Sequence, residues 1–157
     1  AKSPQGGRRK ARLEAERAAK EDTVTTQTKS ETSLTQAYAQ LESISEMVDE
    51  LKTAERSAVD DATIEDAEQA MYVKALSVQV RSGWTAPGDP MEAAEYEILL
   101  CTGGPAVRIV GRLDQYSEPE TATLEHQNWG TPWTDAPIKR EDEETLLTYA
   151  RQFYFGG

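Results

Sequence analysis

The clearest pattern of apolar and polar positions lies between residues 33 and 54. Apolar side chains recur there at the a and d positions of nearly three heptads, which is typical of a helix with one apolar seam. The heptad seam consists of Leu34, Ala37, Leu41, Ile44, Val48 and Leu51. A serine or threonine at position 33 or 32 is suited to cap the helix start. The pattern predicts one helix over residues 33–54, about 33 Å long.

The heptad seam has to be covered, and two arrangements do so. In the first, two or more chains associate through this helix as a short coiled coil, which makes the protein a homo-oligomer. In the second, the helix forms an antiparallel hairpin with a following helix. A second helix is predicted over residues 61–74, where Asp61 can cap and Ile64, Ala67 and Met71 share one face. The sequence leaves both arrangements open.

From residue 76 the apolar period changes from about 3.6 to 2, which indicates β-strands. The alternation of Leu76, Val78 and Val80 predicts a half-buried strand. Further strands are predicted at 94–101, 106–113 and 120–128, with a tight turn at 102–105 and a bulge at Gly111. An acidic run at 141–144 predicts the start of a last helix. The predicted fold class is α+β: a helical segment, a four-stranded antiparallel meander and a C-terminal helix.

Charge is distributed unevenly along the chain. The 157 residues carry a net charge of -11, but residues 1–20 hold seven basic and two acidic side chains, whereas residues 31–70 hold 11 acidic and two basic ones. We therefore predict a flexible basic tail and linker over 1–32, the heptad helix over 33–60 and a small α+β domain over 61–157. An acidic body argues against nucleic-acid binding, except through the basic arm at 1–20.

Several kinds of chemistry are excluded or disfavoured. One cysteine and one histidine rule out a disulfide framework and zinc sites built from those residues. No apolar run is long enough to span a membrane, and no signal-peptide layout leads the chain. Cys101 is expected to be a small buried side chain. His126 is expected to point inward with Leu124 and has no serine or cysteine partner at a diagnostic spacing. We predict no catalytic residue, metal site or cofactor.

The candidate partner-binding residues are of two kinds. Carboxylates concentrate on the predicted helices, where they can also serve only as caps and solvated groups; they are Glu42, Glu46, Asp49, Glu50, Asp60, Asp61, Glu65 and Asp66. Trp129 and Trp133 lie in a Gly/Pro-containing loop, and tryptophan is common at binding hot spots. The alternative for both tryptophans is that they close the end of a small sheet.

Three segments carry a resemblance to known proteins. These are EILLCTGGPAVRI (97–109), QNWGTPWT (127–134) and LLTYARQFYF (146–155). Together they resemble small uncharacterised proteins of tailed bacteriophages and prophages, over about residues 63–157. The resemblance implies no catalytic residue, and it implies a location in the bacterial host cytoplasm or in the virion.

Three functions follow as hypotheses. The first is a non-enzymatic, phage-like binding protein that inhibits a host nucleic-acid-binding or defence protein by presenting carboxylates where phosphates would lie. The second is an oligomeric structural or assembly component that displays the α+β domain on a coiled coil. The third is an enzyme with an unrecognised carboxylate-based site.

Overall fold

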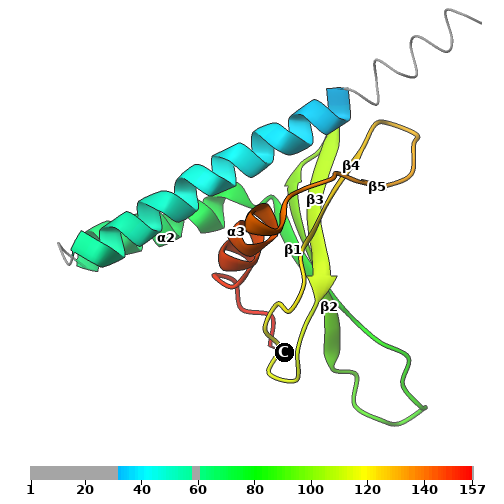
Figure 1. The fold of residues 1–157 in the computed structure, drawn as a ribbon. Coiled ribbons are helices and arrows are strands. Elements are labelled where there is room, and N and C mark those ends of the chain that lie inside the picture. The colour runs from blue at the N-terminus through cyan, green and yellow to red at the C-terminus, as the bar shows by residue number, and fades with distance from the viewer. Residues whose placement is uncertain (1–31, 58–60, 157) are drawn as a thin grey trace, which may run out of the picture.

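A computed structural model describes residues 32–57 and 61–156. A first helix over residues 32–57 is followed by α2 (Asp61–Lys74), five strands and α3 (Arg140–Ala150) (Figure 1). The fold class is therefore α+β, as predicted. Residues 1–31 of the predicted basic tail and linker (1–32), together with residues 58–60 and 157, lie outside the described residues.

The five strands form one antiparallel sheet. They are β1 (Ser77–Ser82), β2 (Ala93–Cys101), β3 (Ala106–Arg112), β4 (Thr123–Gln127) and β5 (Thr134–Asp135), in the spatial order β1-β2-β3-β4-β5. The meander is confirmed, but the sheet has a fifth strand that the sequence did not predict. Since β5 has only two residues, it is too short to show alternation.

The heptad seam is covered within the chain. Ala37, Leu41, Ile44, Val48 and Leu51 are buried in one apolar cluster with residues of the sheet, α2 and α3, and Leu34 packs at its border. The first helix and α2 lie side by side as a hairpin, the second of the two arrangements that the sequence left open, and the first helix also crosses one face of the sheet (Figure 1). The helix continues past the predicted end at residue 54 to residue 57.

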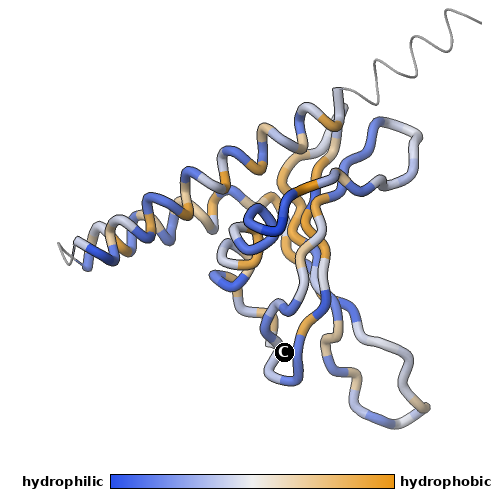
Figure 2. Tube along the Cα trace, in the orientation of Figure 1, coloured by the Kyte–Doolittle hydropathy of each residue, from blue (hydrophilic) through white to orange (hydrophobic). Residues whose placement is uncertain are grey.

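The face of the sheet that the helices cover is called the inner face. Alternate residues of the central strands point to it, and Figure 2 shows their apolar segments facing the helices. The buried apolar residues there are Tyr96, Ile98, Leu100, Val107, Ile109 and Leu124. From α3, Leu146 and Tyr149 join the same core, and the Tyr149 hydroxyl donates to the Met71 carbonyl at 3.0 Å. This bond ties the last helix to α2.

Two predictions about the strands are wrong. Val78 and Val80 share the inner face with Ile98 and Tyr96, yet they are 38% and 48% exposed, and Leu76 is also exposed. The alternation was identified correctly, but these β1 side chains remain accessible at the edge of the sheet. The second error concerns the predicted bulge: the register shifts between Leu99 and Cys101.

Gly111 does not mark a bulge, and the need for glycine at this position has a steric cause. It pairs regularly with Tyr96, and a Cβ at this position would lie 1.9 Å from the carbonyl oxygen of Thr121. That same oxygen accepts a 2.7 Å hydrogen bond from the Tyr96 hydroxyl. The close approach of β3 to the segment before β4 therefore requires the absence of a side chain at residue 111.

Candidate binding surfaces

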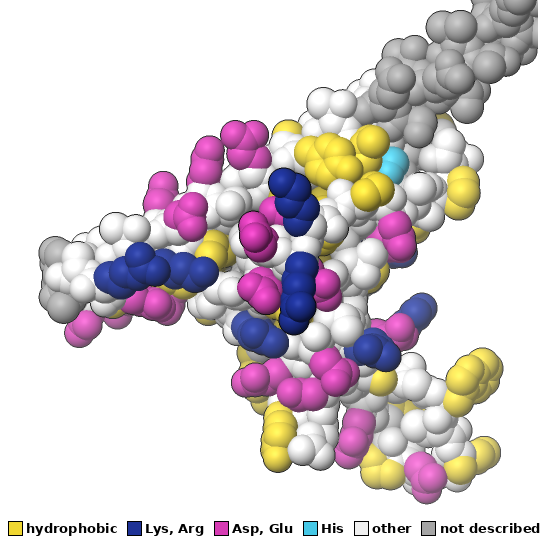
Figure 3. Space-filling model, in the orientation of Figure 1, with side chains coloured by type: hydrophobic (Ala, Val, Ile, Leu, Met, Phe, Trp, Pro, Cys, Tyr) yellow, Lys and Arg dark blue, Asp and Glu magenta, His cyan; other side chains and the backbone are white. Residues whose placement is uncertain are grey.

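The first candidate surface is the outer side of the two N-terminal helices, which we call the acidic hairpin. Its carboxylates are all exposed; they belong to Glu42, Glu46, Asp49, Glu50, Asp61, Glu65 and Asp66. One end of this hairpin projects beyond the sheet, and acidic side chains follow the first helix (Figures 1 and 3). Asp60, which was predicted to belong to the same set, lies outside the described residues.

A groove of about 580 Å³ runs between the helices near the projecting end. Small side chains line it, among them Ala54, Ala67 and Ala70, and Asp49 and Asp66 are at its border. A lysine or arginine side chain has the matching character, with an apolar stem and a charged head. The groove therefore gives the acidic hairpin an apolar contact surface in addition to its charge.

The carboxylates of the acidic hairpin form no ion pair within the described residues, although Lys52 and Arg56 lie on the same first helix and reduce its net charge. Within residues 32–57 and 61–156, three ion pairs are formed, and all of them involve Arg81 or Arg108 of the sheet. The charge of the hairpin is thus available to a partner.

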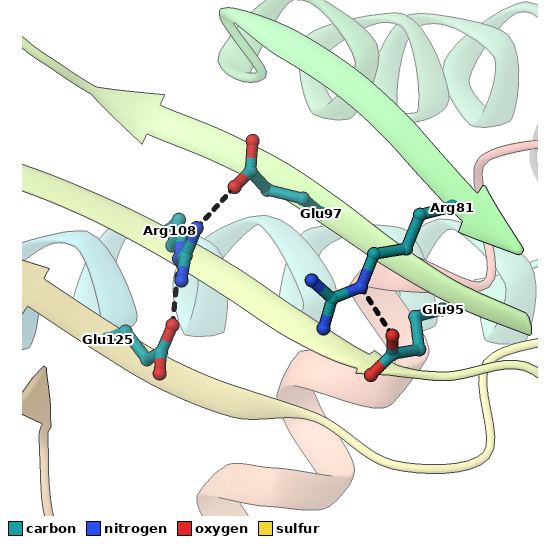
Figure 4. Close-up of polar contacts among 5 residues, drawn as sticks. All are labelled: Arg81, Glu95, Glu97, Arg108 and Glu125. Carbon is teal, nitrogen blue, oxygen red and sulfur yellow. Dashed lines mark hydrogen bonds and ion pairs between the residues drawn. The ribbon is translucent and has the colours of Figure 1, made fainter. Parts of the chain in front are cut away.

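The second candidate surface is the outer face of the sheet, which carries the side chains that point away from the helices. Arg108 lies at its centre and donates to Glu97 at 2.6 Å and to Glu125 at 2.7 Å, so it joins β2, β3 and β4 (Figure 4). The Arg108 guanidinium also lies 4.2 Å from the centre of the Trp133 ring. At the β1 side, Arg81 bonds to Glu95, which lowers the pKa of that carboxyl.

Sequence reasoning did not identify this charged cluster. The alternation of β3 placed Arg108 opposite to Val107 and Ile109, which was correct. The alternation does not give the strand register, which is needed to see the cluster. Arg108 is the cross-strand partner of Glu125 on β4, and Glu97 on β2 lies diagonally across from Arg108. Once the strand pairing is known, an arginine with an outward glutamate on each neighbouring strand indicates a cross-strand ion-pair cluster.

The two predicted tryptophan anchors lie beside the outer face. Trp133 is half-buried against Arg108, whereas Trp129 is 86% exposed. Both line a hollow of about 550 Å³ with Leu99 and Gly103. Because the hairpin packs on the inner face, the structure places the tryptophans and the predicted carboxylates on two separate surfaces.

His126 points to the inner face with Leu124, as predicted, and only 4% of it is exposed. It has a serine partner that no sequence spacing indicated: Ser33 Oγ, 93 residues away, lies 2.7 Å from His126 Nδ1. Asn128 Nδ2 donates to the same Ser33 oxygen at 3.1 Å. Ser33 Oγ therefore joins the His126 ring to the Asn128 amide.

Burial lowers the pKa of His126, so the ring is neutral at pH 7. Ser33 is 1% exposed, and neither residue lines the groove of the acidic hairpin or the hollow beside the tryptophans. The arrangement joins the first turn of the first helix to the end of β4. We call it the buried polar network.

The remaining candidate residues show no assembled site. Cys101 is half-buried, and burial raises the pKa of its thiol. Among the described residues, no group of three or more His, Cys, Asp or Glu side chains is placed to hold a metal ion. In the same part of the chain, no helix has the length and apolar character needed to cross a membrane.

Comparisons with known proteins identify no relative: no family model, no curated protein and no solved structure matches the chain.

Proposed function

We propose that this chain is a non-enzymatic binding protein that engages a basic surface of another protein through its acidic hairpin. The observation that carries the proposal is the set of seven exposed carboxylates that no ion pair within the described residues neutralises. In the phage-like setting that the sequence suggests, the partner is a nucleic-acid-binding or defence protein of the bacterial host, and binding takes place in the host cytoplasm.

The spacing of the charges determines how closely the acidic hairpin can imitate nucleic acid. Glu42, Glu46 and Glu50 follow one another at intervals of four residues, which correspond to about 6 Å of helix rise. Duplex DNA has a denser charge, with one phosphate per ~1.7 Å of its axis. The hairpin is therefore a weaker electrostatic mimic, and the alanine-lined groove supplies apolar contact that a phosphate backbone does not offer.

The test compares two triple charge reversals of equal net charge. One variant changes the hairpin (Glu46→Lys, Asp49→Lys and Glu50→Lys), and the control changes exposed glutamates elsewhere (Glu92→Lys, Glu118→Lys and Glu120→Lys). Each protein is immobilised and exposed to bacterial lysate, and the captured protein is identified by mass spectrometry. The affinity of the captured protein for the wild-type chain and for each variant is then measured with purified components at several salt concentrations, with and without duplex DNA.

We expect the hairpin variant to lose at least about tenfold in affinity and the control to stay within about twofold, since screening confines each charge to about 8 Å at physiological salt. Duplex DNA should compete, and affinity should fall steeply with salt. Equal losses in both variants would show that only net charge matters and would refute the hairpin as the binding surface. Affinity that is unchanged between low and high salt would refute the proposal as well.

A further inference from the structure

The edge of the sheet formed by β1 has a character that differs from the rest of the molecule. Among the described residues, every exposed valine, leucine, isoleucine and methionine lies between residues 73 and 91; they are Val73, Leu76, Val78, Val80 and Met91. β1 is the first strand in the order of the sheet, so within the described chain its second side has no strand partner. Unpaired backbone groups and exposed valines thus coincide at one edge.

Natural proteins usually protect such edges with charges, prolines or bulges, because a free strand edge pairs readily with another strand. β1 has a register shift only at its end, between Arg81 and Ser82. The regular part of the strand is therefore Ser77–Arg81, and Gln79 is its midpoint. This five-residue segment contains one charged side chain, which already bonds to Glu95.

Charge favours a second copy of this chain at the β1 edge. Although the chain carries 28 acidic residues, no aspartate or glutamate occurs between Glu68 and Asp89. The mutual repulsion expected between two acidic proteins is therefore weakest where these two edges would meet.

The side-chain pattern is also self-complementary. In an antiparallel pairing with a two-fold axis at Gln79, Val78 of one copy lies opposite Val80 of the other, and Arg81 lies opposite Ser77. Both valines remain on the inner face, where directly opposed β-branched side chains stabilise a sheet. No like charges are directly opposed. An isologous contact of this kind closes with two subunits.

We infer that two copies of this chain pair edge to edge through β1, with the two-fold axis at Gln79, so that the two sheets join into one continuous ten-stranded sheet. The contact shields the exposed valines and supplies backbone partners for β1. It leaves the acidic hairpin and Arg108 outside the contact. It differs from the predicted coiled-coil oligomer, since the heptad seam stays in the core of each subunit.

The first experiment measures mass in solution by sedimentation from 10 to 500 µM. We expect the wild-type chain to approach twice its mass of 17.4 kDa as concentration rises. Val80→Lys should abolish the dimer, because it places two ammonium groups at the junction while altering a side chain that is already half exposed. The matched control, Thr134→Lys on the opposite edge strand β5, should dimerise like the wild type.

A second experiment tests which residues of the two β1 strands lie opposite each other in the dimer. In a Cys101→Ser background, Gln79→Cys should form a disulfide-linked dimer with oxidised glutathione, since directly opposed Cβ atoms lie about 5 Å apart. Thr134→Cys in the same background is the control and should not cross-link. A wild-type chain that stays monomeric at 500 µM, or a dimer that survives Val80→Lys, would overturn the inference. Cross-linking at position 78 or 80 in place of 79 would support edge pairing and overturn the register.

Discussion

Glu125 and His126 are consecutive residues of β4, and they belong to polar networks that face opposite sides of the same sheet. Glu125 bonds to Arg108 on the outer face, where water reaches the charged groups. His126 bonds to Ser33 on the inner face, where it is uncharged and almost inaccessible. The comparison shows that the side of the sheet, rather than the number of polar contacts, determines how costly each contact is to lose. A buried polar group without its partner pays a desolvation penalty, whereas an accessible one binds water.

The largest effect is therefore expected from Ser33→Ala. This change leaves His126 Nδ1 and the Asn128 amide without the oxygen that joins them, and we expect a loss of about 1–3 kcal/mol in the free energy of unfolding. Chemical denaturation at pH 7 measures it. Ser43→Ala, in the same helix and half-buried, is the control for helix propensity. Equal stability of the two variants would show that the buried polar network contributes nothing.

A smaller effect is expected on the outer face. Arg108→Met keeps an unbranched stem but leaves Glu97 and Glu125 without their shared cation, and we expect a loss of about 1 kcal/mol, because the pair is only partly accessible. Arg81→Met should cost less than Arg108→Met, since its ion pair is exposed. Denaturation curves at 0.05 and 1 M salt should show that the stability lost on Arg108→Met becomes smaller at high salt, because salt screens the ion pairs that the wild type has and the variant lacks. If Arg81→Met lowers the free energy of unfolding more than Arg108→Met does, solvent accessibility does not determine the relative contribution of these ion pairs.

The smallest effect concerns pH. Because burial lowers the pKa of His126, the unfolded chain binds this proton at a higher pH than the folded chain does. Stability should therefore fall as pH decreases through the unfolded value near 6.5, by at most about 0.7 kcal/mol between pH 7 and pH 6. Unfolding free energies at these two pH values measure the change. His126→Gln should remove this component, and an identical pH dependence in both proteins would contradict it.

Local signals predicted much of the fold. The second helix matches its predicted range of 61–74 because its acidic start and its apolar face lie within one short segment; Asp61, predicted as a cap, is already its first helical residue. The long helix and the three central strands follow from clear periodicity in the same way. The two-residue strand β5 has no pattern of its own and exists only because Thr134 and Asp135 pair with β4.

Contacts between distant segments were not predictable from one sequence. The alternation at Val78 and Val80 indicates which face they share, but not whether a helix covers that face. Ser33 and His126 are separated by 93 residues, so no spacing rule connects them. The Arg108 cluster likewise depends on strand register. The candidate carboxylates were identified by composition, and the structure adds that all those described are exposed.

The same long separations have a consequence for synthesis of the chain. The Tyr38 hydroxyl donates to the carbonyl of Pro137, 99 residues later. At about 5–20 residues per second, a ribosome completes that carbonyl roughly 5–20 s after Tyr38. Until the last strands and α3 have been made, the first helix lacks part of the surface that covers Leu41, Ile44 and Val48 in the finished protein. The nascent chain therefore exposes for some seconds an apolar seam that the finished protein buries.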